Sequence, residues 1–396
     1  MYDRGVMLLC PRCRHAFRES QRVCPRDGST LAPAASVDSR IGTTIGNHRL
    51  LDVLGTGGMG AVYLGEHVYI GTRAAIKVLH DHIAADSDAV ARLLQEARAA
   101  AGIGHGNIVA VSDFGETPDG LAYIVMEYVE GRPLDALLEE ASPLPLFRAI
   151  NIVNQIGSGL GAAHEKGIVH RDLKPENVML LERSGRRKIV TRHPGDETAT
   201  VRLEISYDHV KLLDFGVAKI LDSSISRRTL SGMVIGTPQY MAPESARGTH
   251  EIDHRIDIYA LGVMFYEMLT GKLPFDGATP MEMMLAHCSK PVPPMRERNP
   301  GAEVTAGAEA LILRAMAKDP DERHADMNEF LAELQGCYGD ENFLRNVEQQ
   351  PRADEAEPRA PRPRSLTEDL KELFAGGGNE ILERAFADDP PKKKRS

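Results

Sequence analysis

The sequence predicts an α+β protein of two lobes, in which a strand-rich lobe precedes a mostly helical one. From about residue 48, short runs rich in Val, Ile, Leu and Tyr are separated by glycine turns, as in an antiparallel sheet. From about residue 145, long and largely apolar runs such as "DIYALGVMFYEMLTGKLPF" indicate buried helices, this one ending at Gly271 and Pro274. A small cysteine-containing unit precedes the two lobes, and a polar tail follows them.

Composition and charge are those of a soluble globular chain. The 396 residues exceed what one hydrophobic core usually organises, and 42% are hydrophobic and 26% charged. We expect no membrane span and no signal peptide, and therefore a cytoplasmic location. The net charge of −10 argues against a chain devoted to nucleic acid, although the arginines near the N-terminus leave that role open for the first unit.

The N-terminal unit contains an internal repeat. "CPRC" runs from Cys10 to Cys13, and "CPRD" runs from Cys24 to Asp27. Structural zinc takes four ligands, mostly thiolate or imidazole, and a carboxylate oxygen is acceptable. We therefore predict a zinc-ribbon-like module in which these four residues hold structural Zn²⁺. Two alternatives stay open, since His15 could supply the fourth ligand and the aspartate could simply form an Asp-Gly turn.

A glycine-rich stretch, "LGTGGMGAV" at residues 54–62, has the spacing G-x-G-x-x-G. Without Cβ atoms a backbone can approach phosphates closely, but the spacing alone is weak evidence. A dinucleotide-binding turn would open a helix, whereas strand-like residues follow here, so we predict a hairpin tip. Lys77 lies on a later apolar strand, where a buried ammonium needs an anionic partner. Phosphate oxygens and Glu96, on the next predicted helix, both qualify.

Two further motifs carry polar groups suited to phosphate chemistry. "HRDLKPEN" places Asp172, Lys174 and Asn177 in one loop, and "LLDFG" puts Asp214 at the end of an apolar run. An amide oxygen from Asn177 and a carboxylate from Asp214 suit a hard cation such as Mg²⁺, which also binds nucleotide phosphates. Each motif has an ordinary structural explanation, but their joint occurrence in this order does not.

Residues of about 48 to 335 resemble a eukaryotic-type (Hanks-type) serine/threonine protein kinase, and among these the bacterial representatives most closely. The resemblance implies a sheet-rich N-lobe, a helical C-lobe and ATP in the cleft between them. The motifs that carry it are "GTGGMGAV", "AAIK", "HRDLKPEN", "DFG", "GTPQYMAPE", "DIYALG" and Arg323 in "DPDERHAD".

The resemblance also implies the catalytic roles. Lys77, paired with Glu96, would hold the α and β phosphates. Asp172 would accept or orient the proton of the substrate hydroxyl, and Lys174 would neutralise the γ-phosphate.

The same resemblance implies the cofactor and nucleotide contacts. Asn177 and Asp214 would bind Mg²⁺ or Mn²⁺, and the backbones of Glu127 and Val129 would face the adenine edge beside Met126. The other residues expected at ATP are Leu54, Gly55, Thr56, Gly57, Gly58, Met59, Gly60, Ala61 and Val62.

Substrate preference and regulation are implied in the same way. Lys174 and Thr237 are the residue types found in serine/threonine kinases, and Thr237 would belong to the substrate loop. Arg171 resembles that of kinases controlled by activation-loop phosphorylation, and Thr229 and Ser231 align with sites that bacterial relatives autophosphorylate. A phosphate there would order the loop through bonds to Arg171. The alternative is that both are ordinary loop hydroxyls.

We therefore expect a protein kinase of signal transduction that acts on protein substrates. The alternative is a pseudokinase scaffold, against which the presence of every transfer residue argues. A kinase for small molecules is disfavoured by "GTPQYMAPE", which in the family shapes a peptide groove.

An insertion and a tail depart from the family pattern. The insertion alternates polar and apolar residues around "HPGD", which predicts a hairpin. The tail has too few apolar residues to fold, and its short amphipathic segments at 365–386 are either marginal helices or docking segments. We expect regulatory partners at these segments and at the N-terminal unit. The predicted division is 1–33 zinc-ribbon-like module, 34–47 linker, 48–336 kinase domain with the insertion at about 182–207, and 337–396 tail.

Overall fold

The structure is a computed structural model that divides into two compact units, Met1–Leu344 and Arg345–Ser396. All described residues belong to the larger unit, Met1–Leu344, so most of the predicted tail, including 365–386, lies outside the described residues. None of the described helices is long and apolar enough to cross a membrane. The described residues are 7–10, 16–18, 22–25, 28–33, 38–57, 60–79, 97, 101–117, 120–181, 186–193, 196–206, 208–215, 237–249, 252–302 and 304–337.

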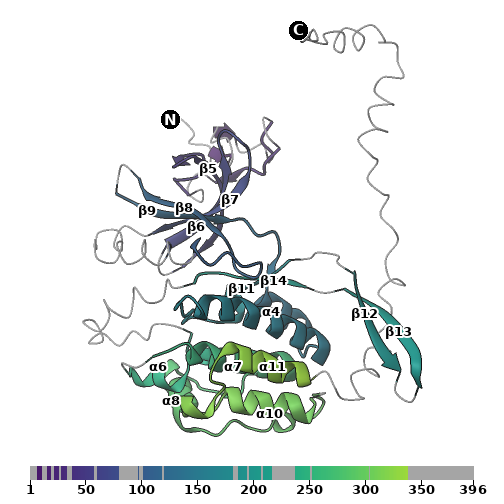
Figure 1. The fold of residues 1–396 in the computed structure, drawn as a ribbon. Helices are drawn as coiled ribbons and strands as arrows, with labels where there is room; N and C mark the ends of the chain where they lie inside the picture. The colour runs from purple at the N-terminus through teal and green to yellow at the C-terminus, as the bar shows by residue number, and fades with distance from the viewer. Residues whose placement is uncertain are drawn as a thin grey trace, which may run out of the picture. The chain divides into compact units, whose positions relative to one another are not determined.

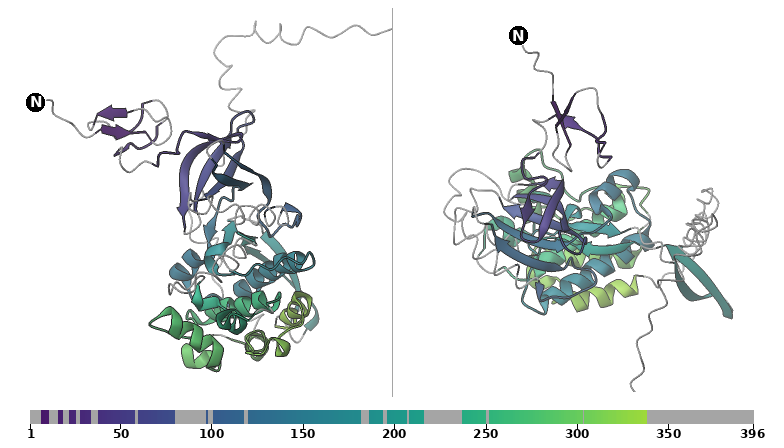
Figure 2. Two further views of the ribbon diagram at one scale, coloured as in Figure 1. Left: turned by 90° about the vertical axis from the view of Figure 1, so that its left-hand side faces the viewer. Right: turned by 90° about the horizontal axis from the view of Figure 1, so that it is seen from above.

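Three short strands form the sheet of the N-terminal unit (Figure 2, purple). Strand β1 (Met7–Leu9) lies between β2 (Ala16–Arg18) and β3 (Ala32–Pro33), and both pairings are antiparallel. Cys10 and Cys24 are buried in one cluster with Leu31. The two cysteine-containing segments of the repeat therefore share one small core.

The N-lobe is an antiparallel sheet of six strands in the order β4-β5-β6-β7-β9-β8 (Figure 1). As predicted, the glycine-rich stretch is the tip of a hairpin, because Thr56 pairs with Ala61 across it and Gly57 N–H donates to Gly60 O at 2.9 Å. The strands are β4 (Thr44–Ile45), β5 (His48–Thr56), β6 (Gly60–His67), β7 (Arg73–Leu79), β8 (Val111–Glu116) and β9 (Ala122–Glu127).

The sheet begins inside the stretch predicted as a linker. Ile41 and Ile45 are buried, and β4 pairs with β5. Tyr63, fully buried on β6, donates its hydroxyl to Asp38 Oδ2 at 3.0 Å and accepts a hydrogen bond from Arg40 at 3.3 Å. These contacts attach residues 38–47 to the N-lobe, and their small, polar composition gave no sign of it.

The glycines of the loop serve different purposes. A Cβ at Gly60 would lie 2.1 Å from the carbonyl oxygen of Val78 on the neighbouring strand, so only glycine allows β6 and β7 to pair here. A Cβ at Gly55 or Gly57 would meet nothing within 4 Å. Access to phosphates thus remains a reason for these two glycines, whereas sheet packing explains Gly60.

The C-lobe is helical, and α7 is its centre. Almost every residue of α7 is buried, and the helix ends as predicted at Gly271, whose φ of +70° suits glycine. Helices α4 and α10 both pack on α7, and α11 packs on α4 and α10 (Figure 1). The helices are α3 (Leu134–Ala141), α4 (Leu146–His164), α6 (Pro243–Arg247), α7 (Arg255–Thr270), α8 (Pro280–Ser289), α9 (Met295–Arg298), α10 (Ala306–Ala315) and α11 (Met327–Gly336).

A small sheet carries the predicted metal ligands and the insertion. Strand β11 (Val178–Leu181) begins directly after Asn177 and pairs with β10 (Arg132–Pro133) and with β14 (His209–Leu212), which ends two residues before Asp214.

Between β11 and β14 the insertion forms the predicted antiparallel hairpin. Its strands are β12 (Arg186–His193) and β13 (Asp196–Ser206). The insertion leaves the pairing of β11 with β14 intact, because Leu181 on one side of it pairs with His209 on the other.

Candidate active site

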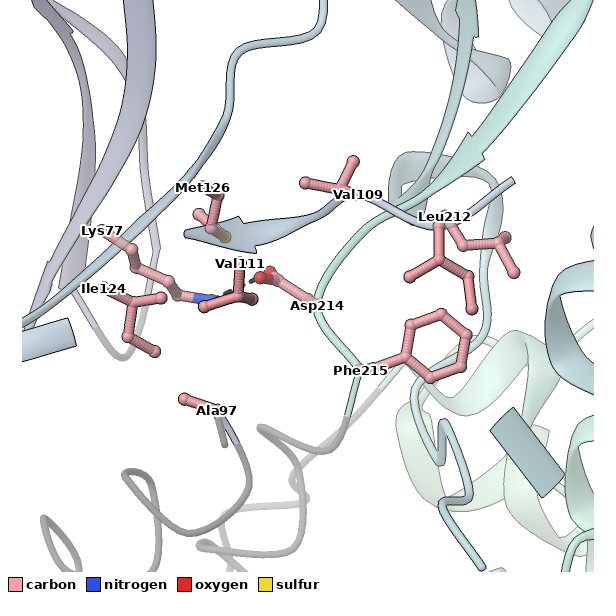
Figure 3. Close-up of a pocket in the computed structure, with 10 residues that line it drawn as sticks. Lys77, Ala97, Val109, Val111, Ile124, Met126, Leu212, Asp214 and Phe215 are labelled. Carbon is pink, nitrogen blue, oxygen red and sulfur yellow. Dashed lines mark hydrogen bonds and ion pairs between the residues drawn. The ribbon is translucent and has the colours of Figure 1, made fainter. Parts of the chain in front are cut away.

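A pocket lies between the N-lobe sheet and the stretch that follows β14 (Figure 3). Among the described residues, its lining is apolar except for Lys77 and Asp214, which point toward each other from opposite sides. The lining residues are Lys77, Ala97, Ile108, Val109, Val111, Ile124, Met126, Leu212, Asp214 and Phe215.

Lys77 is buried on β7, as predicted, and has an anionic partner. Its Nζ donates to Asp214 Oδ2 at 2.9 Å (Figure 3). The expected pair with Glu96 lies outside the described residues and stays a prediction. Ala97, the residue directly after Glu96, is described and lines the pocket.

The charges around Asp214 favour its ionised form. Desolvation works to raise the pKa of Asp214, but the charge and hydrogen bond of Lys77, with the charges of His170 and Lys174, hold that pKa below its usual value. Its backbone has a φ of +56°, a left-handed conformation that is uncommon for residues other than glycine. On either side, His170 Nε2 bonds Leu213 O at 2.9 Å and the His170 ring packs on Phe215 with centroids 4.7 Å apart.

Asp257, a buried carboxylate on α7, holds the start of the loop at residues 170–177, which contains the predicted catalytic residues. It accepts hydrogen bonds from the backbone N–H of His170 at 2.8 Å and of Arg171 at 2.9 Å, and its Oδ2 lies 2.8 Å from His164 Nε2. Burial works to raise the pKa of Asp257, but its hydrogen bond to His164 and the charges of both histidines keep it below its usual value. Arg171 is kept at a φ of +69° by these contacts.

Asp257 is the first residue of the motif "DIYALG", but the motif alone does not predict its contacts with the loop. The available signal was an acidic residue at the start of a long apolar helix. Buried charges need partners, so such a residue indicates a structured polar contact.

The loop brings together the predicted catalytic residues. Lys174 Nζ lies 3.1 Å from Asp172 Oδ2 and donates to Thr237 Oγ1 at 2.9 Å. Asn177 Nδ2 donates to the carbonyl of Asp172 at 2.7 Å and approaches its Oδ2 at 3.3 Å. Asp172 is thus fixed between a cation and an amide.

The donor set at Asn177 and Asp214 fits a hard cation. Because Asn177 donates through Nδ2, its Oδ1 is available, and within the described part of the chain neither Asn177 Oδ1 nor Asp214 Oδ1 accepts a hydrogen bond. Leu213 N–H donates to Asn177 O at 2.9 Å, which ties the two segments together. One amide and one carboxylate oxygen are ligands that Mg²⁺ accepts.

The end of β9 and the residues directly after it carry the groups expected at adenine. Met126 lines the pocket, and Glu127 N–H donates to Ala110 O at 2.8 Å. Neither backbone polar group of Val129 has a hydrogen-bond partner among the described residues. An adenine edge would supply donors and acceptors of the required kind.

The glycine-rich stretch is only partly described. Leu54 is exposed, as are Gly55, Thr56 and Gly57, whereas Gly58 and Met59 lie outside the described residues. Gly60, Ala61 and Val62 begin β6.

Arg323 and Glu244 form a buried ion pair in the C-lobe. Two guanidinium nitrogens of Arg323 donate to the two carboxylate oxygens of Glu244 at 2.6 and 2.8 Å, and the guanidinium lies over the Tyr259 ring at 4.9 Å. This bidentate geometry fastens the segment after Thr237 to the helical core. It brings together the motifs "APE" and "DPDERHAD".

A family model described as "Protein kinase domain" matches residues 48–333. The chain belongs to the protein kinase family. Curated relatives include the serine/threonine-protein kinases Pkn1 and Pkn3 of Myxococcus xanthus. Pkn1 is 42% identical over 315 residues, which are 78% of this chain and 42% of the relative. Pkn3 is 37% identical over 358 residues, which are 88% of this chain and 61% of the relative.

Other relatives agree with this assignment. The kinase is 38% identical to the serine/threonine-protein kinase PknB of Mycolicibacterium smegmatis over 291 residues, 72% of this chain and 42% of the relative. A crystal structure of the Mycobacterium tuberculosis PknI kinase domain is 26% identical, with a TM-score of 0.55, and the match covers 76% of this chain and 98% of that one. The chain therefore has a bilobal kinase domain of the serine/threonine type, but spans only part of the length of its curated relatives.

Lys77→Met tests the electrostatics of the site. Without the ammonium, the pKa of Asp214 rises, because Lys77 is the main group that lowers it. A carboxylate whose pKa is lower in the folded than in the unfolded protein stabilises the fold at pH values above its unfolded pKa. This stabilisation is lost as the pH falls through the folded pKa. Carboxyl carbon NMR titration measures the shift, with Lys174→Met as the control for a weaker cation. Equal Asp214 titration in the two variants would contradict this account.

Proposed function

We propose that the protein transfers the γ-phosphate of ATP to serine and threonine hydroxyls of proteins. The observation that carries this proposal is the position of Asp172, 3.1 Å from Lys174 and bonded to Asn177. A carboxylate held there is suited to accept or orient the proton of an attacking hydroxyl. The relatives named as serine/threonine-protein kinases support the same chemistry.

The surrounding residues would divide the work of binding and charge neutralisation. Lys77 would bind phosphate oxygens, and Lys174 would stabilise charge on the transferred group. Asn177 and Asp214 would hold Mg²⁺, which neutralises phosphate charge when bound. Because the transition state of phosphoryl transfer is loose, positioning and charge account for most of the catalysis.

Selectivity for serine and threonine is supported by the hydrogen bond from Lys174 to Thr237. It joins the catalytic loop to the substrate loop, where the hydroxyl of a peptide would arrive. Thr229 and Ser231 lie outside the described residues, so their autophosphorylation stays a prediction. Regulatory partners at 1–33 and 365–386 and a cytoplasmic location also stay predictions.

Asp172→Asn tests the proposed activity. Phosphate incorporation into a serine peptide and into the protein itself should fall by about 10²–10⁴-fold, the usual contribution of a general base. ATP affinity and thermal stability should change little, because the amide fits the same space. Transfer by Asp172→Asn at the wild-type rate would refute the role of Asp172. A wild type that binds ATP but transfers no phosphate would favour the pseudokinase scaffold.

We also propose that the N-terminal unit is a zinc-ribbon-like module. Burial of Cys10 and Cys24 in one cluster supports a shared site, and Cys24 N–H donates to Ser29 O at 2.7 Å. No group of three metal-binding side chains occurs among the described residues. Cys13, His15 and Asp27 lie outside that part of the chain.

Metal analysis of purified protein tests the module. We expect one Zn²⁺ per chain, lost in Cys10→Ser, because a structural zinc site requires all its ligands. Asp27→Ala should lower the zinc content if the aspartate is the fourth ligand, and His15→Ala should do so if the histidine is. Full zinc in both alanine variants would refute the four-ligand site.

A further inference from the structure

A charged pair joins the strand before Asp214 to the segment expected to bind adenine. Lys211 Nζ, on β14, lies 2.5 Å from Glu127 Oε2 at the end of β9. Their side chains are 13% and 37% exposed, so water screens the pair only partly. None of the sequence motifs includes Lys211, and its charge has no role in the chemistry described above.

Both partners make further contacts with one short segment, residues 108–110. Lys211 Nζ lies 3.4 Å from Ile108 O. Glu127 accepts from Ala110 N–H at 3.4 Å through its carboxylate and donates its own N–H to Ala110 O at 2.8 Å. The pair therefore closes a small ring of contacts around residues 108–110, two of which line the pocket.

Strand β14 is attached on both sides of Lys211. Before it, Arg148 of α4 binds both carboxylate oxygens of Asp208 at 2.7 and 2.9 Å. After it, Leu212 N–H donates to Asn107 O at 2.8 Å, and Val109 N–H donates to Leu212 O at 2.9 Å. The bonds of Leu212 lie between Lys211 and Asp214, so they can transmit the position of Lys211 to Asp214, three residues further on, whereas the Arg148–Asp208 pair lies outside that stretch.

We propose that Lys211 is a positioning residue that fixes the distance between the adenine-binding segment and Asp214. This inference rests on the proposed function, because only a nucleotide with a metal ion reaches both ends of the site. A rigid separation lets one ligand make both sets of contacts without reorganising the protein. The alternative is a pair that only stabilises the fold.

The two possibilities differ in their effect on ligands of different length. Adenosine reaches only the adenine-binding segment, whereas a nucleoside triphosphate with Mg²⁺ reaches Asp214 as well. A positioning residue must therefore matter more for the longer ligand. A residue that only stabilises the fold would change both affinities alike or neither of them.

Calorimetric titration of the full chain tests the inference. The ligands are adenosine and the non-hydrolysable triphosphate AMP-PNP with Mg²⁺. Lys211→Met should weaken triphosphate binding about tenfold and adenosine binding less than about twofold, as for coupled groups in one network. Lys211→Arg should restore triphosphate binding, since it keeps the charge. Arg148→Met, which breaks the other ion pair beside β14, should leave the ratio of the two affinities unchanged.

Other outcomes distinguish a failure of the positioning role from a failure of the proposed function. Equal changes for both ligands, or none, in Lys211→Met would overturn the positioning role. If that variant does not fold, Glu127→Gln removes the same ion pair at nearly constant volume and should show the same selective loss. A wild type that binds neither ligand would instead contradict the proposed function.

Discussion

The shape of the loop at residues 170–177 depends on one buried carboxylate. Asp257 belongs to α7, the helix on which the C-lobe packs, and it accepts two backbone hydrogen bonds from the loop while a third contact joins it to His164. A buried charge is strongly unfavourable without such partners, so helix and loop each require the other. The loop then presents Asp172, and through Asn177 it fixes the segment that leads to Asp214.

A second constraint is the ion pair that joins the two lobes across the pocket. Among the described residues that line the apolar pocket, Lys77 and Asp214 form one charged pair, which joins β7 of the N-lobe to the stretch after β14. Charges in apolar surroundings interact more strongly than in water, so few groups would be needed to bind phosphate and metal in the proposed site. The pair of Lys211 and Glu127 joins β14 to the end of β9, next in sequence to Leu212 and Met126 of the pocket lining. The site is therefore fixed at both ends by ion pairs between segments distant in sequence.

The sequence identified residues with chemistry in short motifs, but not the contacts between distant segments. Features that depend on local patterns could be predicted. These are the strand position of Lys77, the tip of the glycine-rich hairpin, the helix end at Gly271 and the inserted hairpin. The roles of Asp257 and Lys211 could not, because each depends on a partner more than 80 residues away. Likewise, only the register of β6 and β7 shows why position 60 must be glycine.

Amide hydrogen exchange in Asp257→Asn tests most directly whether the buried carboxylate holds the loop. Asparagine has one acceptor oxygen and would turn an N–H toward a backbone donor, so a bond worth about 1–3 kcal/mol is lost. The amides of His170 and Arg171 should then exchange about ten- to a hundredfold faster than in the wild type, while those of α7 stay protected. Unchanged protection of both loop amides would contradict this account.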